Sequence, residues 1–195
     1  GLIVAAKFTD DYWYRAGILQ VQTPTAASAK FLDYGNIDTI QKPFIKVLHP
    51  DFLKDTIYSF ECSLSGLPDL VPEEMLATFN DTAVGVRLSL TIDKKNGEKY
   101  GVSLKTTDGV DVGKALLDVH PVHVEPQIKS PAPSVQPTTV AGEDELLVAC
   151  KLPLHVGSIL PVEISNVTHV TSFDCQREED LPTIDSFQER FEAHY

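Results

Sequence analysis

Histidine and cysteine are the side chains of this sequence that could most directly bind a metal or act in catalysis. His120 and His123 lie three positions apart, but a proline stands between them and no cysteine is near. Zinc sites usually draw on several such ligands at short, regular spacings. Cys62, Cys150 and Cys175 are far apart and form no CxxC pair, which argues against a disulfide framework and a structural zinc. The sequence therefore predicts no metal, no cofactor and no catalytic residue.

The charge balance limits the kind of partner. The chain of 195 residues carries 16 basic and 28 acidic side chains, for a net charge of −12. Binding along a phosphate backbone requires an excess of lysine and arginine, so direct nucleic-acid binding is not expected. An acidic protein attracts basic partners, although the same charge also serves plain solubility. The pair Asp10–Asp11 is typical of a solvated turn rather than a cation site.

Neither a membrane span nor a secretion signal is predicted. Apolar residues make up 43 % of the chain, enough for a packed core. No apolar run approaches the roughly 20 residues needed to cross a bilayer. The segment Gly1–Lys7 is short, lacks the basic lead of a signal peptide and has the pattern of a β-strand. Together with the separated cysteines, this favours a cytoplasmic protein.

Short β-strands separated by turn residues are expected across residues 1–48. The runs with strand character are Leu2–Phe8, Tyr12–Gln20, Ala29–Asp33 and Ile37–Gln41. Strands of about five residues joined by tight turns are typical of a small barrel. Residues 43–48 could add a fifth strand or a short helical turn.

A second β-rich unit is expected over residues 56–125. Its predicted elements are strands at Ile57–Leu64, Val84–Ile92 and Lys99–Thr106 and short helices at Val71–Phe79 and Val112–Val119. The last two strands flank an Asn-Gly pair, which favours a tight hairpin.

Proline marks the clearest break in the chain. Residues 126–145 hold four prolines among Ser, Thr and Gln, which predicts an extended linker. Order then returns, with alternating strands at Ser158–Val167 and Val170–Gln176 and a helix over Asp180–Tyr195. On that helix Ile184, Phe187 and Phe191 fall on one face, so we expect this face to be buried.

Two short segments carry a family resemblance. Residues 6–16 read AKFTDDYWYRA, and residues 30–36 read KFLDYGN. This pattern resembles the core of an extended Tudor domain, as found in Tudor staphylococcal-nuclease-like proteins and germline Tudor proteins. The resemblance is strong over residues 1–48 and moderate over residues 56–125. It implies a mainly β fold, in which a Tudor (SH3-like) barrel is joined to an OB-type, staphylococcal-nuclease-like barrel with a few short helices.

The resemblance divides the chain into four segments. They are a Tudor barrel at residues 1–55, the C-terminal strands of the nuclease-like subdomain at 56–125, a linker, mostly Pro/Ser/Thr-rich, at 126–156, and the N-terminal strands and helix of that subdomain at 157–195. In this family two strands and a helix normally precede the Tudor core. Residues 157–195 have that shape, so we expect them to complete the barrel. Exchange with a neighbouring chain and membership in a following Tudor unit are the alternatives.

The resemblance also implies a binding site. In this family four aromatic rings and an asparagine form a cage for methylated arginine, and by position they are Phe8, Tyr14, Phe31, Tyr34 and Asn36. Dimethylarginine keeps its charge, and its planar guanidinium stacks well on aromatic faces, at about 0.5–2 kcal/mol per contact. The asparagine carbonyl can accept a remaining guanidinium N–H. The alternative is that these rings are simply barrel core.

The implied function is that of a non-catalytic reader. It would bind symmetrically dimethylated arginine in an Arg/Gly-rich peptide of a partner such as an Argonaute or PIWI-type protein. Its setting would be a scaffold in small-RNA silencing, including the piRNA pathway, or in germ-granule assembly, in the cytoplasm and in perinuclear granules. The main alternative is a scaffold that binds its partner through a surface independent of methylation.

Two further functions are disfavoured. RNA binding through the OB-type barrel is opposed by the acidic charge balance. Phosphodiester cleavage by a nuclease-like barrel would need a carboxylate-bound metal and clustered arginines. The arginines of this chain are scattered along it, at Arg15, Arg87, Arg177 and Arg190.

Overall fold

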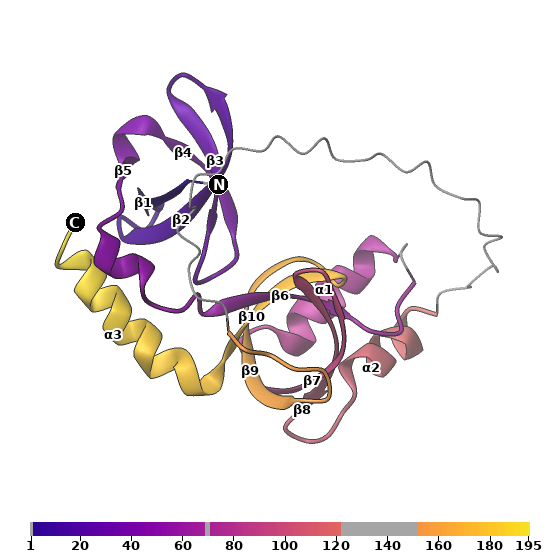
Figure 1. Ribbon diagram of the computed structural model, residues 1–195. Coiled ribbons are helices and arrows are strands. Elements are labelled where there is room, and N and C mark those ends of the chain that lie inside the picture. Colours follow the sequence, from indigo (N-terminus) through magenta and orange to yellow (C-terminus); the bar gives the residue numbers. More distant parts are fainter. Residues whose placement is uncertain (1, 69–70, 122–151) are drawn as a thin grey trace.

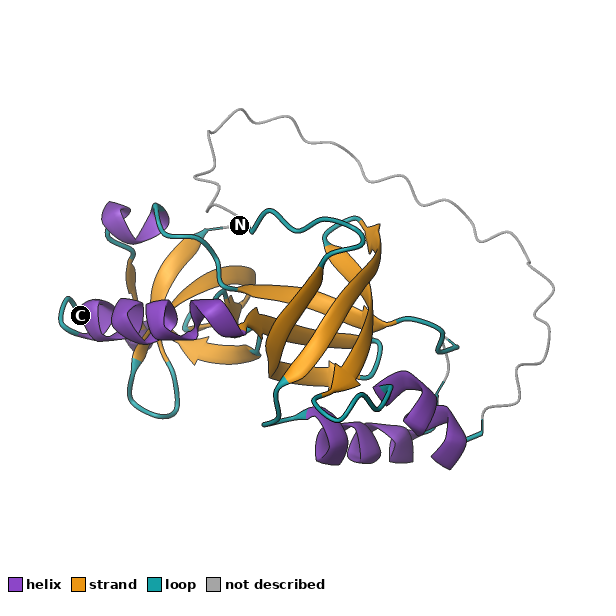
Figure 2. Cartoon of the chain, turned by 90° about the horizontal axis from the view of Figure 1, so that it is seen from below, coloured by secondary structure: helices purple, strands orange, loops and turns teal. Residues whose placement is uncertain are grey.

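The computed structural model describes residues 2–68, 71–121 and 152–195. It contains a five-stranded sheet and a closed five-stranded barrel that lie beside one another (Figure 1). A long C-terminal helix runs from the barrel along the sheet, and two shorter helices cover the far side of the barrel (Figure 2). The protein is therefore mainly β, as the sequence predicts.

The sheet is formed by residues of the first predicted unit. Its strands are β1 Ile3–Lys7, β2 Trp13–Thr23, β3 Ala26–Phe31, β4 Ile37–Gln41 and β5 Ile45–Val47. They pair antiparallel in the order β4-β3-β2-β1-β5. Along β1, Val4 and Ala6 join one core cluster and Ala5 joins another, so this strand is buried on both faces. This burial explains its continuous apolar run.

The barrel combines strands from two distant parts of the chain. Its strands are β6 Ser59–Leu64, β7 Leu88–Asn96, β8 Lys99–Thr106, β9 Ile159–His169 and β10 Ser172–Arg177. The closed order is β10-β6-β8-β7-β9, with β9 pairing with β7 and β10 pairing with β6. The expected pairing of residues 158–167 with a strand of the 56–125 unit is thus present within one chain.

Helices close the barrel at one end and link it to the sheet. α1 Glu73–Ala83 and α2 Val112–Val119 bury Met75, Phe79 and Leu116 in the barrel core. α3 Leu181–Glu192 follows β10 through a short 3-10 turn at Glu178–Asp180. Two more 3-10 turns lie on the sheet side, at Lys42–Phe44 and Pro50–Leu53. The predicted apolar face of α3 packs on Phe52, Tyr58 and Trp13, with its buried side chains Ile184, Phe187 and Phe191.

Two elements lie further along the chain than predicted. The helix expected at Val71–Phe79 spans Glu73–Ala83, because Pro72 is extended and serves as its N-cap. The strand expected at Val84–Ile92 spans Leu88–Asn96, because Gly85 has a positive φ of 74° that turns the chain after the helix. Sequence alternation placed both elements but could not fix their ends.

The end of the predicted linker packs against the barrel. Leu154 is buried in the barrel core, and Leu152 packs beside it, so the described part of the 126–156 segment is not free. Residues 126–151, with Cys150, and also His123 lie outside the described residues. Among the described helices, none combines the length and the apolar character that crossing a membrane requires.

Candidate aromatic-cage site

The structure brings the four predicted aromatic rings together. Phe8 follows β1, Tyr14 lies on β2, Phe31 ends β3, and Tyr34 lies in the turn before β4. Phe8 is 5.1 Å from Phe31 and 6.3 Å from Tyr14, between ring centroids. Tyr14 is 5.7 Å from Phe31 and 5.4 Å from Tyr34. The rings meet edge to face in all four pairs, at interplanar angles of 74–88°. Adjacent walls of an aromatic cage can meet in this way, and edge-to-face contact is also the usual packing of aromatic rings in a core.

The four rings differ in their access to solvent. Phe31 is 1 % exposed, because Phe8 and Tyr14 pack against it, whereas Phe8, Tyr14 and Tyr34 are half-buried. Phe31 therefore lies at the closed side of the cluster, and the other three rings offer surface to a ligand. Phe31 is part of the core, whereas Phe8, Tyr14 and Tyr34 pack against core clusters and keep part of their surface accessible.

Asn36 stands at the end of the same turn with its side-chain amide unused. Its backbone carbonyl accepts a hydrogen bond from the Phe31 amide at 2.9 Å, which closes the turn. The side chain is half-buried and makes no hydrogen bond to another described residue. This amide therefore has donor and acceptor capacity left for water or for a ligand.

The electrostatic environment of the two tyrosines is negative. Burial, a hydrogen bond to Asp10 and the charges of Asp10 and Glu192 raise the pKa of Tyr14. Burial and the carboxylates Asp33, Asp185 and Asp10 raise the pKa of Tyr34 to about 12. Carboxylates that oppose a phenolate favour a cation at the same place. Both phenols therefore stay neutral at physiological pH in a field that attracts positive charge.

Two barrel strands hold the turn that carries Tyr34. The hydroxyl of Ser165 on β9 donates to the Tyr34 carbonyl at 2.7 Å. The amide of Gln176 on β10 donates to the Asp33 carbonyl at 2.6 Å. Gly35 lies directly against Asp174 of β10, since a Cβ added to this glycine would come within 2.1 Å of the Asp174 Cγ. The barrel thus fixes one wall of the cage.

A buried ion pair fixes the same turn from the other side. Arg15 is 1 % exposed, and its Nε and Nη2 donate to the Asp33 carboxylate at 2.9 and 2.6 Å. Its remaining hydrogens reach backbone carbonyls of the segment after the sheet, those of Phe52, Asp55 and Thr56. The guanidinium also lies 4.4 Å from the Phe187 ring centroid on α3. Every donor of this arginine is therefore used structurally.

Comparison with known proteins matches the first part of the chain to a family. The Tudor domain model matches residues 1–66. Staphylococcal nuclease domain-containing protein 1 of Drosophila melanogaster is 33 % identical over 60 % of this chain, and Tudor domain-containing protein 1 of Danio rerio is 29 % identical over 75 % of it. The chain spans 13 % of the length of each of these two proteins.

Solved structures extend the match to the barrel. The extended Tudor domain of Drosophila melanogaster Tudor-SN is similar with a TM-score of 0.56 and 31 % identity, over 60 % of this chain and 57 % of that one. The chain contains an extended Tudor domain. The extended Tudor domain from BmPAPI in complex with sDMA is similar with a TM-score of 0.53 and 26 % identity, over 62 % of this chain and 69 % of that one.

Trp13 shows that neighbouring side chains of β2 point to opposite faces of the sheet. As predicted from strand alternation, it points away from Tyr14 and is buried at 9 % exposure. Its ring lies 5.8 Å from Tyr195 and 4.1 Å from the Lys46 Nζ. Its backbone is held by α3, through Glu192 and through Gln188, which donates to the Trp13 carbonyl at 2.8 Å. Tyr12, one step before, is 53 % exposed.

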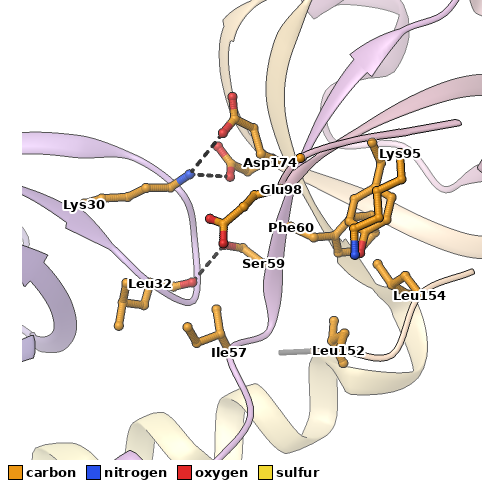
Figure 3. Close-up of a pocket in the computed structure, with 13 residues that line it drawn as sticks. Lys30, Leu32, Ile57, Ser59, Phe60, Lys95, Glu98, Leu152, Leu154 and Asp174 are labelled. Atoms are coloured by element: carbon orange, nitrogen blue, oxygen red, sulfur yellow. Dashed lines mark hydrogen bonds and ion pairs between the residues drawn. The ribbon is translucent and has the colours of Figure 1, made fainter. Parts of the chain in front are cut away.

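The extended Tudor domain has a hollow of about 310 Å³ between sheet and barrel (Figure 3). Lys30 and Leu32, the neighbours of Phe31 in sequence, line it together with Ile57, Phe60 and Leu154. Side chains alternate along β3, so Lys30 projects to the face opposite Phe31. This hollow is therefore separate from the cage.

Sequence reasoning treated Arg15 only as a scattered arginine and assigned no role to Asp33. Both residues belong to the two family segments, at positions next to Tyr14 and Tyr34. Strand alternation could have placed Arg15 opposite Tyr14. The full set of Arg15 partners could not be predicted, because the carbonyl acceptors and the ring that surround its guanidinium come from distant segments.

Proposed function

We propose that this extended Tudor domain reads symmetrically dimethylated arginine through the cage of Phe8, Tyr14, Phe31, Tyr34 and Asn36. The observation that carries the proposal is one arrangement: three half-exposed rings meet edge to face beside an asparagine amide without a partner among the described residues. A related extended Tudor domain, 26 % identical, was solved in complex with sDMA.

The chemistry of a methylated guanidinium fits this arrangement. Methylation leaves its charge in place and replaces hydrogen-bond donors with methyl groups, which lowers the cost of entering an apolar site. The flat cation gains from each aromatic face, and the Asn36 carbonyl can accept a remaining N–H. Ordering a peptide opposes these gains, so we expect affinities on the order of micromolar or weaker.

A methylation-independent partner would need another surface, and the hollow of Figure 3 is one in which Lys30, Glu61 and Asp174 are already paired. Lys30 lies 2.9 Å from Asp174 and 4.0 Å from Glu61. Glu61 is in turn 2.7 Å from Lys99. Binding a charged group there would disturb existing ion pairs, whereas the cage offers ring faces and an Asn36 amide without a partner among the described residues. This difference favours the reader function over the alternative.

The wider setting rests on the resemblance to germline Tudor and Tudor staphylococcal-nuclease-like proteins. Symmetric dimethylarginine in an Arg/Gly-rich segment is the proposed target, with an Argonaute or PIWI-type protein as the class of partner. A non-catalytic scaffold in small-RNA silencing or germ granules is the proposed role, and the Tudor domain family match supports a reader module rather than an enzyme. The buried free thiols of Cys62 and Cys175 fit the reducing cytoplasm that we propose as its location.

Calorimetry with three matched Arg/Gly-rich peptides tests the proposal. One peptide carries symmetric dimethylarginine, one carries asymmetric dimethylarginine, and one carries unmodified arginine. We expect the wild type to bind the symmetric form most tightly. Tyr34→Ala should weaken that binding by about 1–2 kcal/mol, because one aromatic face is lost, while circular dichroism shows a folded protein.

The matched control is Tyr12→Ala, which removes an exposed tyrosine outside the cage. It should leave peptide binding unchanged. Equal binding of all three peptides by the wild type would contradict the proposed function.

A further inference from the structure

We propose that Asp10 is a specificity-determining residue of the cage: its carboxylate holds the Tyr14 hydroxyl and so makes the site select a cation over a neutral ligand of the same shape. The inference rests on the proposed function and adds a residue outside the four rings and Asn36. It concerns the turn between β1 and β2, which lies beside the cage.

The turn holds the Asp10 carboxylate in place with two hydrogen bonds. Its Oδ1 accepts from the Tyr12 backbone amide at 3.0 Å, and its Oδ2 accepts from the Tyr14 hydroxyl at 2.7 Å. The Phe8 amide donates to the Tyr12 carbonyl at 2.9 Å, which closes the turn behind the carboxylate. Asp10 is therefore positioned by the same backbone that carries Phe8 and leads into Tyr14.

The neighbouring basic residue does not neutralise Asp10. Lys7 pairs with Asp11 instead, at 2.9 Å. Asp11 has a positive φ of 71°, which turns it away from the regular strand path. The two hydrogen bonds to Asp10 come from neutral donors, and a donor without charge leaves the carboxylate's negative charge acting on its surroundings.

A carboxylate bound to a phenol changes what the ring offers a ligand. A charge-assisted hydrogen bond is short and strong, so it fixes the hydroxyl and the plane of the ring. It also draws the phenol proton toward the carboxylate, which increases the negative charge of the ring face that attracts a cation. The full charge of Asp10 adds a second attraction of the same sign.

Tyr14 transmits this effect to the whole cluster. It is in edge contact with Phe8, Phe31 and Tyr34, so the plane of Tyr14 sets the position of the other walls. The other ionisable groups that act on Tyr14 are Tyr34 and Glu192 of α3. Glu192 is engaged by the Trp13 and Gln188 nitrogens, which leaves Asp10 as the acid bound directly to the phenol.

Four proteins test this role: wild type, Asp10→Asn, Tyr14→Phe and the double variant. Each is titrated by calorimetry with the symmetric dimethylarginine peptide and with the same peptide carrying a neutral dimethylated urea in place of the guanidinium. We expect Asp10→Asn and Tyr14→Phe each to weaken binding of the cationic peptide by about 3–10-fold. The fold-loss of affinity in the double variant should be smaller than the product of the two single losses, since the shared hydrogen bond can be lost only once. Binding of the neutral peptide should weaken less, because it loses the positioning of the Tyr14 ring but not the attraction between the charges.

Asp11→Asn is the matched control, because it removes the same charge one residue away and tolerates a positive φ. It should bind both peptides as the wild type does. Ultraviolet titration of the phenols supplies a second readout, in which Asp10→Asn should lower the pKa of Tyr14. Equal losses with Asp10→Asn and Asp11→Asn, or an equal loss for the neutral peptide, would overturn the inference.

These measurements distinguish a wrong reader function from a wrong role of Asp10. A wild type that binds methylated and unmodified peptides equally overturns the reader function and this inference together. A wild type that discriminates, with Asp10→Asn indistinguishable from it, overturns the role of Asp10 alone.

Discussion

At the scale of single residues, neighbours on one strand divide two tasks between them. Tyr14 faces the cage, while Arg15, next in sequence, faces the interior and binds Asp33. Asp33 in turn precedes Tyr34, so the ion pair lies directly behind the cage wall. Burial raises the pKa of the Asp33 carboxyl, and the hydrogen bonds and charge of Arg15 oppose that rise. The turn that carries Tyr34 therefore depends on a buried arginine outside the proposed cage.

Alkaline pH should reveal how strongly the fold holds Tyr34. Its folded pKa is about 12 against an ordinary value of 10.0, mainly because of burial. Above pH 10 the unfolded chain releases this proton before the folded protein does, so the free energy of unfolding should fall as pH rises from 10 toward 12. The same direction applies to Tyr14, whose pKa is also raised.

Urea denaturation of wild type and Tyr34→Phe at pH 9, 10 and 11 measures this loss. The variant lacks the titrating hydroxyl, so its stability should fall less over the same range. Parallel curves for the two proteins would show that Tyr34 does not contribute.

At the scale of elements, the turn between β3 and β4 is the point where sheet and barrel meet. Ser165 and Gln176 donate to its carbonyls, and Asp174 fills the space beside Gly35. Asp174 is 4 % exposed, and it also bonds to Lys30 and Asn166. A change in this turn should therefore affect folding and ligand binding together.

Gly35→Ala should be more costly than an ordinary glycine replacement. The residue has a positive φ of 94°, and its added Cβ would lie 2.1 Å from the Asp174 Cγ, so strain and collision act together. We expect a loss of about 1–3 kcal/mol or more in the free energy of unfolding, with weaker binding of methylated peptide.

Gly97→Ala is the matched control for that substitution. Gly97 has a positive φ of 63° but open space around it, so only the backbone strain remains. It should cost about 1 kcal/mol and leave peptide binding intact. Equal losses of unfolding free energy for the two variants would show that the close contact between Gly35 and Asp174 adds nothing to the backbone strain.

The sequence predicted the helices and strands better than the contacts between them. The alternation of residues 158–176 and the apolar face of α3 predicted both strands and the buried positions of Phe187 and Phe191. The family segments predicted which rings meet, but not that Phe31 would be closed off while its neighbours stay accessible. That outcome depends on how the rings of Phe8 and Tyr14 are oriented over Phe31. The three rings come from different segments, so the residue pattern of a single strand does not predict their relative orientation.

At the scale of the whole molecule, the net charge of −12 should act on a basic peptide before contact. Attraction over such distances accelerates association and is screened by salt, with a Debye length of about 10 Å at 0.1 M. Stopped-flow measurement at increasing ionic strength should show association slowing more than dissociation accelerates. An association rate that stays constant across salt concentrations would show that the acidic residues do not attract the peptide over a distance and serve only solubility.

The closed barrel also has a consequence for synthesis on the ribosome. β8 ends at Thr106 and β9 begins at Ile159, so three barrel strands emerge well before the two that complete the ring. At about 5–20 residues per second, the nascent chain waits on the order of several seconds with the edges of β6 and β7 unpaired. Unpaired edges invite pairing with other chains. During that interval the exposed edges of β6 and β7 are where mispairing of the newly made protein can begin.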